Sequence, residues 1–359
     1  MQEETPSQIP VPVQIRERIL VMRDGCNLQL LCTPSSKERA TLKEKEESTW
    51  TLMVSRIMEK VRRKLGVEEE DGEKKTSRSK FPPLVFLHGS YHSSWCYQEF
   101  LLPFFSRLGY ECYAPSFRGT GPSGMSSTNK DGKTVQIEEH VSDLEEALDF
   151  VIAQGCPGGT KPVLIAHSFA GLVAMKFLEE ARLRDKCSGV CFLCSVPPSG
   201  NGPMTLRFLQ MRLLDSFKIV YGFVFKAVTF DPSIARELFF DDSFSDETIL
   251  QYTKCFKADS KVVIDLPRLA KKLPSVTSAD AEGRARWLTQ PPSLQKRLLV
   301  LGAGRDFIVD RQGVDETARF VGLSEGEMLP GVYHDAMLGE KALVTAKRLE
   351  LFLSQNFKE

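Results

Sequence analysis

One serine at the end of an apolar run is well suited to nucleophilic chemistry. The run Val163–His167 has the pattern of a buried strand and the segment from Phe169 that of a helix, so Ser168 falls at their junction. A nucleophile at such a junction occupies a sharp turn, which requires small residues two positions away on either side. Ala166 and Ala170 stand at those positions, where glycine is usual. The pattern therefore predicts a serine nucleophile at position 168.

Two further motifs precede this serine. The segment Pro83–Ser90 reads as a strand that ends in His-Gly-Ser, and such a loop can present a backbone N–H to a developing oxyanion. We expect the N–H groups of Ser90 and of Phe169, the residue after the nucleophile, to form an oxyanion hole. The second motif, Ser116–Gly124, is a Gly-rich turn that follows another expected strand.

These three motifs, in this order and spacing, resemble those of the α/β-hydrolase family over roughly residues 81–359. The resemblance implies an α/β fold: a mostly parallel eight-stranded sheet flanked by helices, with an inserted helical lid. In that family the Gly-rich turn usually reads Asp-x-Arg-Gly-x-Gly-x-Ser. Arg118 and Ser123 match this pattern, whereas Ser116 stands where the aspartate is usual. That aspartate is not part of the family's triad, so the departure leaves the implied catalysis intact.

The family's triad runs in the order serine, acid, histidine. Of the five histidines only His334 follows Ser168, and its loop before the final helix is where the family's base lies. The acid follows a late strand, and the family pattern Gly-x-x-Asp-x-x-Val maps onto Asp306. Asp310 is the alternative acid, although it would also suit the N-cap of the next helix. We assign Asp335 to loop or helix-cap geometry.

The resemblance implies hydrolysis of carboxylic esters through an acyl-enzyme, with Ser168 attacking, His334 as base and Asp306 orienting the imidazole. No metal or organic cofactor is required, and we expect none. Haloalkane dehalogenases and epoxide hydrolases of this fold use an aspartate nucleophile, so a serine at this position disfavours both. The cluster of Cys187, Cys191 and Cys194 reads as part of a buried strand rather than a metal site. Cys191 and Cys194 are three apart, so on a strand they point to opposite faces, and no second pair completes four ligands.

The sequence specifies the substrate class less closely than it specifies the triad. The segment His88–Tyr97 resembles one found in plant methylesterases and hydroxynitrile lyases, whereas the Arg-Gly-Thr-Gly-Pro-Ser turn resembles monoacylglycerol lipases and lysophospholipase-like members. On this basis His92 and Trp95 could reach the substrate pocket, and Trp95 could equally be helix core. Nine of the 23 phenylalanines fall in residues 201–260, which favours apolar acyl groups.

We therefore expect a carboxylesterase or lipase-like serine hydrolase whose partner is a small-molecule ester. Two alternatives stay open. The first is an acyltransferase or hydroxynitrile-lyase-like enzyme on the same triad. The second is a non-catalytic homologue that binds a ligand.

Alternating strand and helix patterns after residue 80 predict βαβ units and a mostly parallel sheet, which would position these residues. The expected strands are 84–87, 111–115, 162–166, 189–196 and 297–301. The expected helices are 95–108, 135–154, 169–183, 313–320 and 341–357. A hairpin of Ile15–Met22 and Leu28–Cys32 would open the fold. The chain then reads as one α/β domain at 12–359, enlarged by a helical lid at 199–288.

A second enlargement is a charged surface insertion at 35–80, which we expect to be partly disordered. Within it, apolar residues from Trp50 to Leu65 recur at helical spacing among basic ones. Such a basic amphipathic helix can lie on an anionic membrane surface, so residues 50–65 are a candidate for peripheral membrane contact. The alternative is a helix that packs its apolar stripe on the neighbouring domain.

Composition excludes several classes of function. The chain has 359 residues with 47 Lys+Arg against 47 Asp+Glu, so it lacks the basic surplus of a nucleic-acid-binding protein, and we expect no such partner. No apolar run is long enough to span a bilayer, and the acidic first residues do not resemble a secretory signal. We therefore expect an intracellular, cytoplasmic enzyme with reduced cysteines. The oligomeric state is left open.

Overall fold

The computed structural model is centred on one mixed sheet. It describes residues 13–35, 81–125, 134–156, 160–211, 218, 221–222, 225–261, 263–292, 294 and 297–357. Within these residues, eight strands lie in the order β1-β2-β4-β3-β6-β7-β9-β10. Their bounds are β1 Arg16–Val21, β2 Asn27–Cys32, β3 Leu84–Leu87, β4 Cys112–Pro115, β6 Val163–His167, β7 Gly189–Leu193, β9 Leu298–Ala303 and β10 Glu327–Leu329.

The predicted eight-stranded, mostly parallel sheet is confirmed. β1 pairs with β2 and β2 with β4 in antiparallel fashion, while the other neighbouring strands of the sheet are parallel. Every residue of β3, β6 and β7 is buried, as expected for parallel strands covered on both faces. The carboxyl ends of these strands therefore meet at one edge of the sheet, which is where the predicted chemistry falls.

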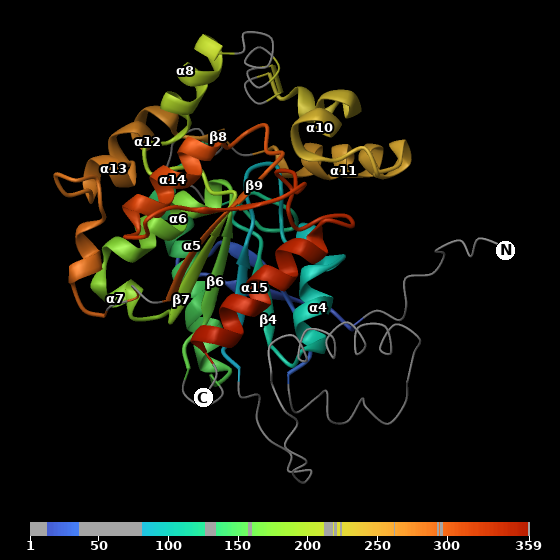
Figure 1. Ribbon diagram of the computed structural model, residues 1–359. Coiled ribbons are helices and arrows are strands. Elements are labelled where there is room, and N and C mark those ends of the chain that lie inside the picture. The colour runs from blue at the N-terminus through green and yellow to red at the C-terminus, as the bar shows by residue number, and fades with distance from the viewer. Residues whose placement is uncertain are drawn as a thin grey trace, which may run out of the picture.

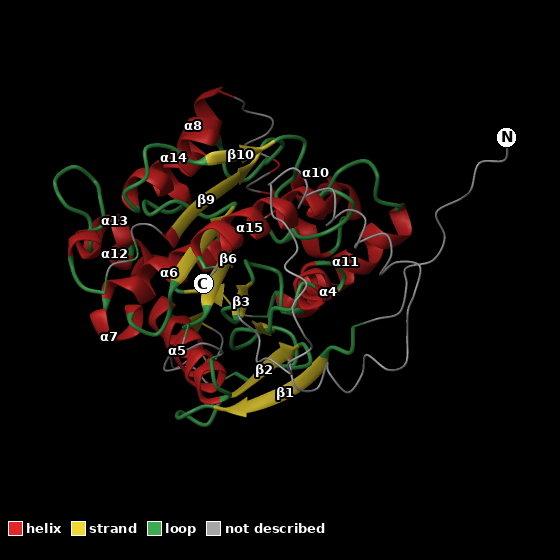
Figure 2. Ribbon diagram, turned by 60° about the horizontal axis from the view of Figure 1, so that its bottom comes forward, coloured by secondary structure: helices red, strands yellow, loops and turns green. Residues whose placement is uncertain are grey.

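Helices cover both faces of the sheet (Figures 1 and 2). α4 and α15 pack side by side on one face, and α5 packs against α6 on the other. α14 packs on β9. The bounds of the core helices are α3 Trp95–Gln98, α4 Leu101–Arg107, α5 Ile137–Ala153, α6 Phe169–Glu179, α7 Ala181–Arg184, α14 Arg311–Phe320 and α15 Ala342–Asn356.

Two of the expected helices are interrupted. The helix predicted at 95–108 is divided into α3 and α4, because the ring of Pro103 would collide with the carbonyl of Glu99 in a continuous helix. Because α4 begins at Leu101, Pro103 lies in its first turn, where the missing N–H removes no hydrogen bond of the helix. The helix predicted at 169–183 is likewise divided, since Glu180 adopts an extended conformation between α6 and α7.

A helical segment is inserted between β7 and β9, at the position predicted for the lid. Its elements are α8 Asn201–Met211, η2 Ala227–Thr229, α10 Pro232–Phe239, α11 Asp246–Asp259, β8 Val263–Ile264, α12 Leu266–Lys272, α13 Pro274–Thr277 and η3 Arg286–Thr289. Figure 1 shows α10 and α11 beside each other above one end of the sheet. β8 pairs in parallel with β5 (Thr134–Val135), a two-residue strand before α5. This unpredicted pairing joins the insertion to the core; a lid function for it stays a prediction.

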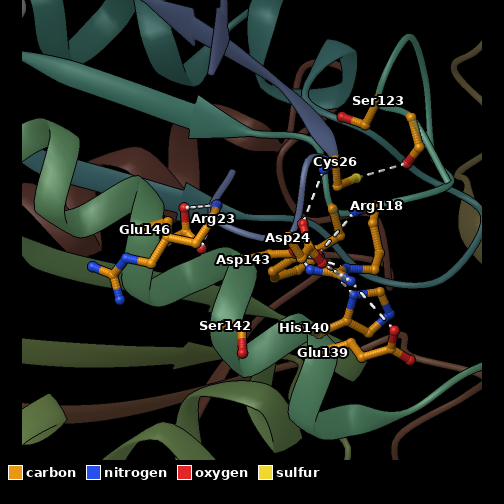
Figure 3. Close-up of polar contacts among 12 residues, drawn as sticks. Arg23, Asp24, Cys26, Arg118, Ser123, Glu139, His140, Ser142, Asp143 and Glu146 are labelled. Carbon is orange, nitrogen blue, oxygen red and sulfur yellow. Dashed lines mark hydrogen bonds and ion pairs between the residues drawn. The ribbon is translucent and has the colours of Figure 1, made fainter. Parts of the chain in front are cut away.

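A buried ionic network joins the opening hairpin to the core (Figure 3). Arg118, in the turn after β4, donates to both Asp143 of α5 and Asp24 of the hairpin turn, at 2.6 and 2.8 Å. Its backbone N–H also donates to Asp143, at 3.0 Å. The side chains of Arg118 and Asp143 are 3% and 0% exposed. The arginine of the Gly-rich turn thus fixes that turn against two other elements.

Ser116, which replaces the family's usual aspartate, is part of a neutral network instead. Its hydroxyl donates to Gln29 Oε1 at 2.7 Å and accepts the backbone N–H of Ser94 at 3.0 Å. The departure from the family pattern is therefore accommodated by hydroxyl and amide groups.

Two further expectations can be compared with the structure, and a third falls on residues that it does not describe. The nine cysteines are all free thiols, and Cys187, Cys191 and Cys194 are buried. The charged insertion beyond residue 35 and the amphipathic segment Trp50–Leu65 lie outside the described residues. Across the part of the chain that is described, every helix is too short or too polar to cross a bilayer.

Candidate active site

Ser168 lies in a strained turn between β6 and α6. Its backbone φ of 53° is in the left-handed region, which residues with a Cβ rarely adopt and which tends to occur at functional positions. Ala166 and Ala170 are fully buried on either side. One residue further on, a Cβ added at Gly171 would lie only 1.8 Å from the hydroxyl of Ser195, in the loop after β7, so a larger residue there would displace Ser195. The predicted sharp junction is thus present.

The structure brings Ser168, His334 and Asp306 together from three separate loops. His334 Nε2 lies 3.0 Å from Ser168 Oγ, and His334 Nδ1 lies 2.8 and 3.0 Å from the two carboxylate oxygens of Asp306. A carboxylate can only accept, so Nδ1 carries the hydrogen and Nε2 presents its lone pair to the serine hydroxyl. The arrangement can take a proton from Ser168 while a carbonyl is attacked.

The carboxylate of Asp306 is held by its own loop. Its Oδ1 accepts the backbone N–H groups of Ile308 and Val309, at 2.7 and 2.9 Å. Asp310, the alternative acid, instead caps α14 through Gly313 N–H at 2.8 Å and binds Arg207. Of the two acids, only Asp306 therefore faces His334.

The loop after β3 lies directly against Ser168. A Cβ added at Gly89 would lie 2.7 Å from Ser168 Cβ and 3.3 Å from its Oγ, so only glycine permits this approach. Ser90 follows at once, and Phe169 is the first residue of α6, where a backbone N–H has no partner within the helix. Phe169 thus directly follows the serine, and Ser90 follows the glycine that lies against it; their role as oxyanion donors stays a prediction.

His88 fixes the conformation of that loop. Its Nε2 accepts the backbone N–H of Phe117 at 3.0 Å, and its Nδ1 lies 2.9 Å from the Gly89 carbonyl, to which it donates. Burial lowers the pKa of His88 to about 3, so the ring is neutral, as these two bonds require.

The two predicted pocket residues lie in a buried aromatic cluster beneath the insertion. The rings of His92 and Trp95 stack at 5.5 Å, and Trp95 stacks in turn on Tyr252 of α11. Trp95 Nε1 donates to Asp259, also of α11, at 2.8 Å. These contacts place both side chains at the boundary between core and insertion. Their role in binding substrate stays a prediction.

One cavity, of about 860 Å³, lies between α10, α11 and the loops that carry Asp306 and His334. Asp306, Phe307 and Tyr333 are on its wall, together with Phe240 of the insertion. The cavity therefore approaches the site from the side of the acid. Neither His92 nor Trp95 contributes to its lining.

Three functional contacts were not predicted from the sequence. Asp335 was assigned to loop or cap geometry, but its carboxylate lies 2.9 Å from His92 Nε2 in a distant loop. His167 Nε2 donates to the backbone carbonyl of His334 at 2.9 Å. Burial and the nearby carboxylate of Asp306 raise the pKa of the Cys194 thiol. Each contact joins segments far apart in the chain, and no local pattern marks it.

The buried ligand atoms of His167, Cys194 and His334 lie within 4.8 Å of one another, close enough to suggest a metal site. His334 uses both ring nitrogens for Ser168 and Asp306, and burial raises the pKa of the Cys194 thiol. His167 Nε2 donates to the carbonyl of His334, whereas its Nδ1 is buried with no hydrogen-bond partner among the described residues. The two hydrogen bonds of His334 therefore compete with metal binding at this cluster.

Comparisons with known proteins bear on the family and the fold of the chain. A model of the alpha/beta hydrolase family matches residues 84–347. A carbendazim hydrolyzing esterase from Nocardioides sp. (strain SG-4G) is 27% identical over 128 residues, which cover 34% of this chain and 46% of that protein. The match thus spans about half the length of the relative.

Solved structures are similar to nearly the whole chain. A mutant of the meta-cleavage product hydrolase CumD has 12% identity and a TM-score of 0.59, over 94% of this chain and 98% of that chain. A bromoperoxidase from Bacillus anthracis has 14% identity and a TM-score of 0.55, over 94% and 100%. An epoxide hydrolase from Vigna radiata has 15% identity and a TM-score of 0.52, over 95% and 98%. At these identities the likeness shows the fold alone.

Proposed function

The chain belongs to the alpha/beta hydrolase family, and on that premise we propose that it is a serine hydrolase that cleaves carboxylic esters through an acyl-enzyme. The observation that carries the proposal is the continuous hydrogen-bonded path from Asp306 through His334 to Ser168. The path ends at a serine in the strained turn that a nucleophile of this fold occupies.

In this mechanism Ser168 attacks the ester carbonyl while Nε2 of His334 takes its proton. Asp306 keeps the hydrogen on Nδ1 and stabilises the imidazolium that forms. The amides of Ser90 and Phe169 stabilise the tetrahedral oxyanion, each contributing about 3 kcal/mol. His334 then protonates the leaving alcohol, and it acts as base again when water attacks the acyl-enzyme.

We propose apolar acyl groups as the substrate class. Aromatic rings of the insertion reach the base itself: Phe239 of α10 lies 5.8 Å from the ring of His334 and 5.1 Å from Phe256 of α11. Such rings favour the burial of an apolar chain beside the reacting carbonyl. The relative from Nocardioides is named an esterase, which supports the reaction class.

The test is reaction with a fluorophosphonate and with p-nitrophenyl esters of increasing acyl length. We expect covalent labelling of the native protein at Ser168 and a kcat/KM that rises with chain length, because each buried CH2 stabilises the bound state by about 0.8 kcal/mol. Product analysis with an added alcohol separates hydrolysis from acyl transfer. Absence of both labelling and ester turnover would favour the non-catalytic alternative, and a preference for small polar esters would contradict the substrate class.

Replacing Gly89 by alanine is expected to lower kcat/KM about 100-fold and to lower the free energy of unfolding by about 1–3 kcal/mol through overpacking. The added methyl would contact Ser168 Cβ at 2.7 Å and move the nucleophile away from its partners. A displacement of about 1 Å is enough for a loss of this size. Gly202→Ala is the matched control, since a Cβ there meets no atom within 4 Å. Equal activities of the two variants would show that Gly89 does not constrain Ser168.

A further inference from the structure

A single imidazole joins the two loops that would hold the oxyanion donor and the base. His92 Nδ1 lies 2.8 Å from the backbone carbonyl of Ser90, and His92 Nε2 lies 2.9 Å from the carboxylate of Asp335. Ser90 provides one proposed oxyanion donor, and Asp335 directly follows His334. His92 therefore bridges two segments that are far apart in the sequence and adjacent in the site.

These two contacts specify the protonation state of His92. A carbonyl and a carboxylate can only accept hydrogen bonds, whereas a neutral imidazole has only one N–H to donate. Both bonds therefore require a hydrogen on each ring nitrogen. The proton resides on the imidazole rather than on Asp335, because imidazole is the more basic of the two groups. The pair is thus an imidazolium and a carboxylate.

The pair is sealed from water by the insertion. The side chains of His92 and Asp335 are 1% and 0% exposed. Phe239 of α10 and Phe256 of α11 meet the ring of His92 edge-on, at 5.9 and 4.9 Å, and Trp95 stacks on it. The backbone N–H of Asp335 donates to the carbonyl of Phe239 at 3.2 Å.

The charges around His92 favour the imidazolium. Burial opposes its charge, but the Asp335 carboxylate, the Ser90 carbonyl and the more distant Asp259 of α11 outweigh burial and raise the pKa of His92. His88 and His167 face the same region as neutral rings, since burial lowers the pKa of both. The neighbouring Cys96 is a neutral thiol, because burial raises its pKa.

Asp335 depends on this partner. Its Oδ2 contacts His92, while its Oδ1 is buried with no hydrogen-bond partner among the described residues. A buried carboxylate with so few donors is stabilised mainly by the imidazolium that faces it. Loss of the proton from His92 would leave that charge uncompensated and would remove one of the two bonds.

We propose that His92 is a positioning residue, whose two N–H groups hold the oxyanion loop and the loop of His334 in register for catalysis. This inference rests on the proposed esterase function. It predicts that activity falls at alkaline pH: the bridge is complete below the raised pKa of His92 and is lost as the pH rises through it. The same loss lowers the stability of the folded state.

The test is the pH dependence of kcat and KM for a p-nitrophenyl ester in four proteins. For the native protein we expect an alkaline decline in kcat. Asp335→Asn should shift that decline to lower pH by about one unit or more, because the carboxylate no longer favours the imidazolium. His92→Gln should lower kcat about 10- to 100-fold at neutral pH with little change in KM. This variant should show no alkaline decline in kcat, neither at the native pH nor at a shifted one.

His140→Gln is the matched control, since it removes the histidine from another buried pair, with Asp143 at 3.4 Å. We expect it to lose stability yet keep the native pH profile. If ester turnover is present and His92→Gln and Asp335→Asn both keep the native kcat and pH profile, His92 has no positioning role. If the native protein turns over no ester, the proposed function fails instead, and the two failures are thereby distinguished.

The protonation state of His92 can be measured by NMR, without an activity assay. In Ser168→Ala protein labelled with ¹⁵N-histidine, the His92 signal is identified by its loss in the variant that also carries His92→Gln. We expect both ring nitrogens of His92 to be protonated at neutral pH and to titrate as one unit at higher pH. A neutral imidazole with a single N–H at neutral pH would overturn the bridge.

Discussion

Replacing Ser168 by alanine is expected to abolish ester hydrolysis, with kcat falling by roughly 10⁴- to 10⁶-fold, and to abolish fluorophosphonate labelling. The hydroxyl lies 3.0 Å from His334 Nε2, and without it no acyl-enzyme can form on this turn. The remaining activity would come from water attacking a substrate still held by the oxyanion donors. Initial rates of p-nitrophenyl ester hydrolysis and mass spectrometry of labelled protein measure both effects.

Ser188→Ala is the control for that substitution. Ser188 is also buried, but its hydroxyl donates to the carbonyl of Lys161 at 2.6 Å, at the far end of β7. We expect it to retain native activity and labelling. Robust labelling of Ser168→Ala would show that the nucleophile is a different residue.

A combined substitution distinguishes a concerted unit from independent contributions. His334→Ala should reduce labelling and kcat almost as far as Ser168→Ala, because the serine is a weak nucleophile without its base. Once either residue is lost, removing the other should lower kcat and labelling only slightly further. Losses that add in the double variant would mean that Ser168 and His334 do not act in one step.

The sequence predicts the parts of this molecule that local patterns encode. The apolar runs of β3, β6 and β9 and the small residues around Ser168 are short-range signals, and each corresponds to an observed element. The site residues could be assigned because their order along the chain is fixed by a known fold. The helix predicted at 95–108 is wrong in one respect, because Pro103 forbids a continuous helix and α4 begins anew at Leu101.

Long-range contacts were not predictable in the same way. β5 and β8 have two residues each, which is too few to show the alternation of apolar and polar residues that marks a strand. Their pairing depends on where the insertion is anchored. The partner of Asp335 was not predicted, because its neighbours in sequence suggested a local role, whereas His92 is 243 positions away. A buried pair of this kind is determined by packing, which the order of residues does not reveal.

The network around Arg118 leads to the largest expected loss of stability (Figure 3). Burial opposes the charge of Asp143, but bonds from His140 and Arg118 outweigh it and lower the pKa of that carboxyl. Because its pKa is lowered on folding, this carboxylate stabilises the folded state at pH values above the pKa that it has in the unfolded chain, near 4. That stabilisation is lost as the pH falls through the folded pKa.

Arg118→Gln is therefore expected to lower the free energy of unfolding by about 3–5 kcal/mol at neutral pH, since it leaves the carboxylate of Asp143 buried without its main cation. The acid-dependent part of the stability should shrink in parallel, because the pKa of Asp143 moves back toward its unfolded value. Urea unfolding at several pH values measures both effects.

Arg23→Gln is the matched control, an arginine from the same region that pairs with Asp149 at 2.8 Å. Those side chains are 69% and 35% exposed, so solvent already screens the pair and the expected loss is below about 1 kcal/mol. The backbone bonds of Arg23 to Glu146 are unaffected by the change. Equal losses in the two variants would mean that the burial of the Arg118–Asp143 pair does not determine its contribution. A loss confined to Arg118→Gln would show that the Gly-rich turn is held in place by the ionic bond to α5.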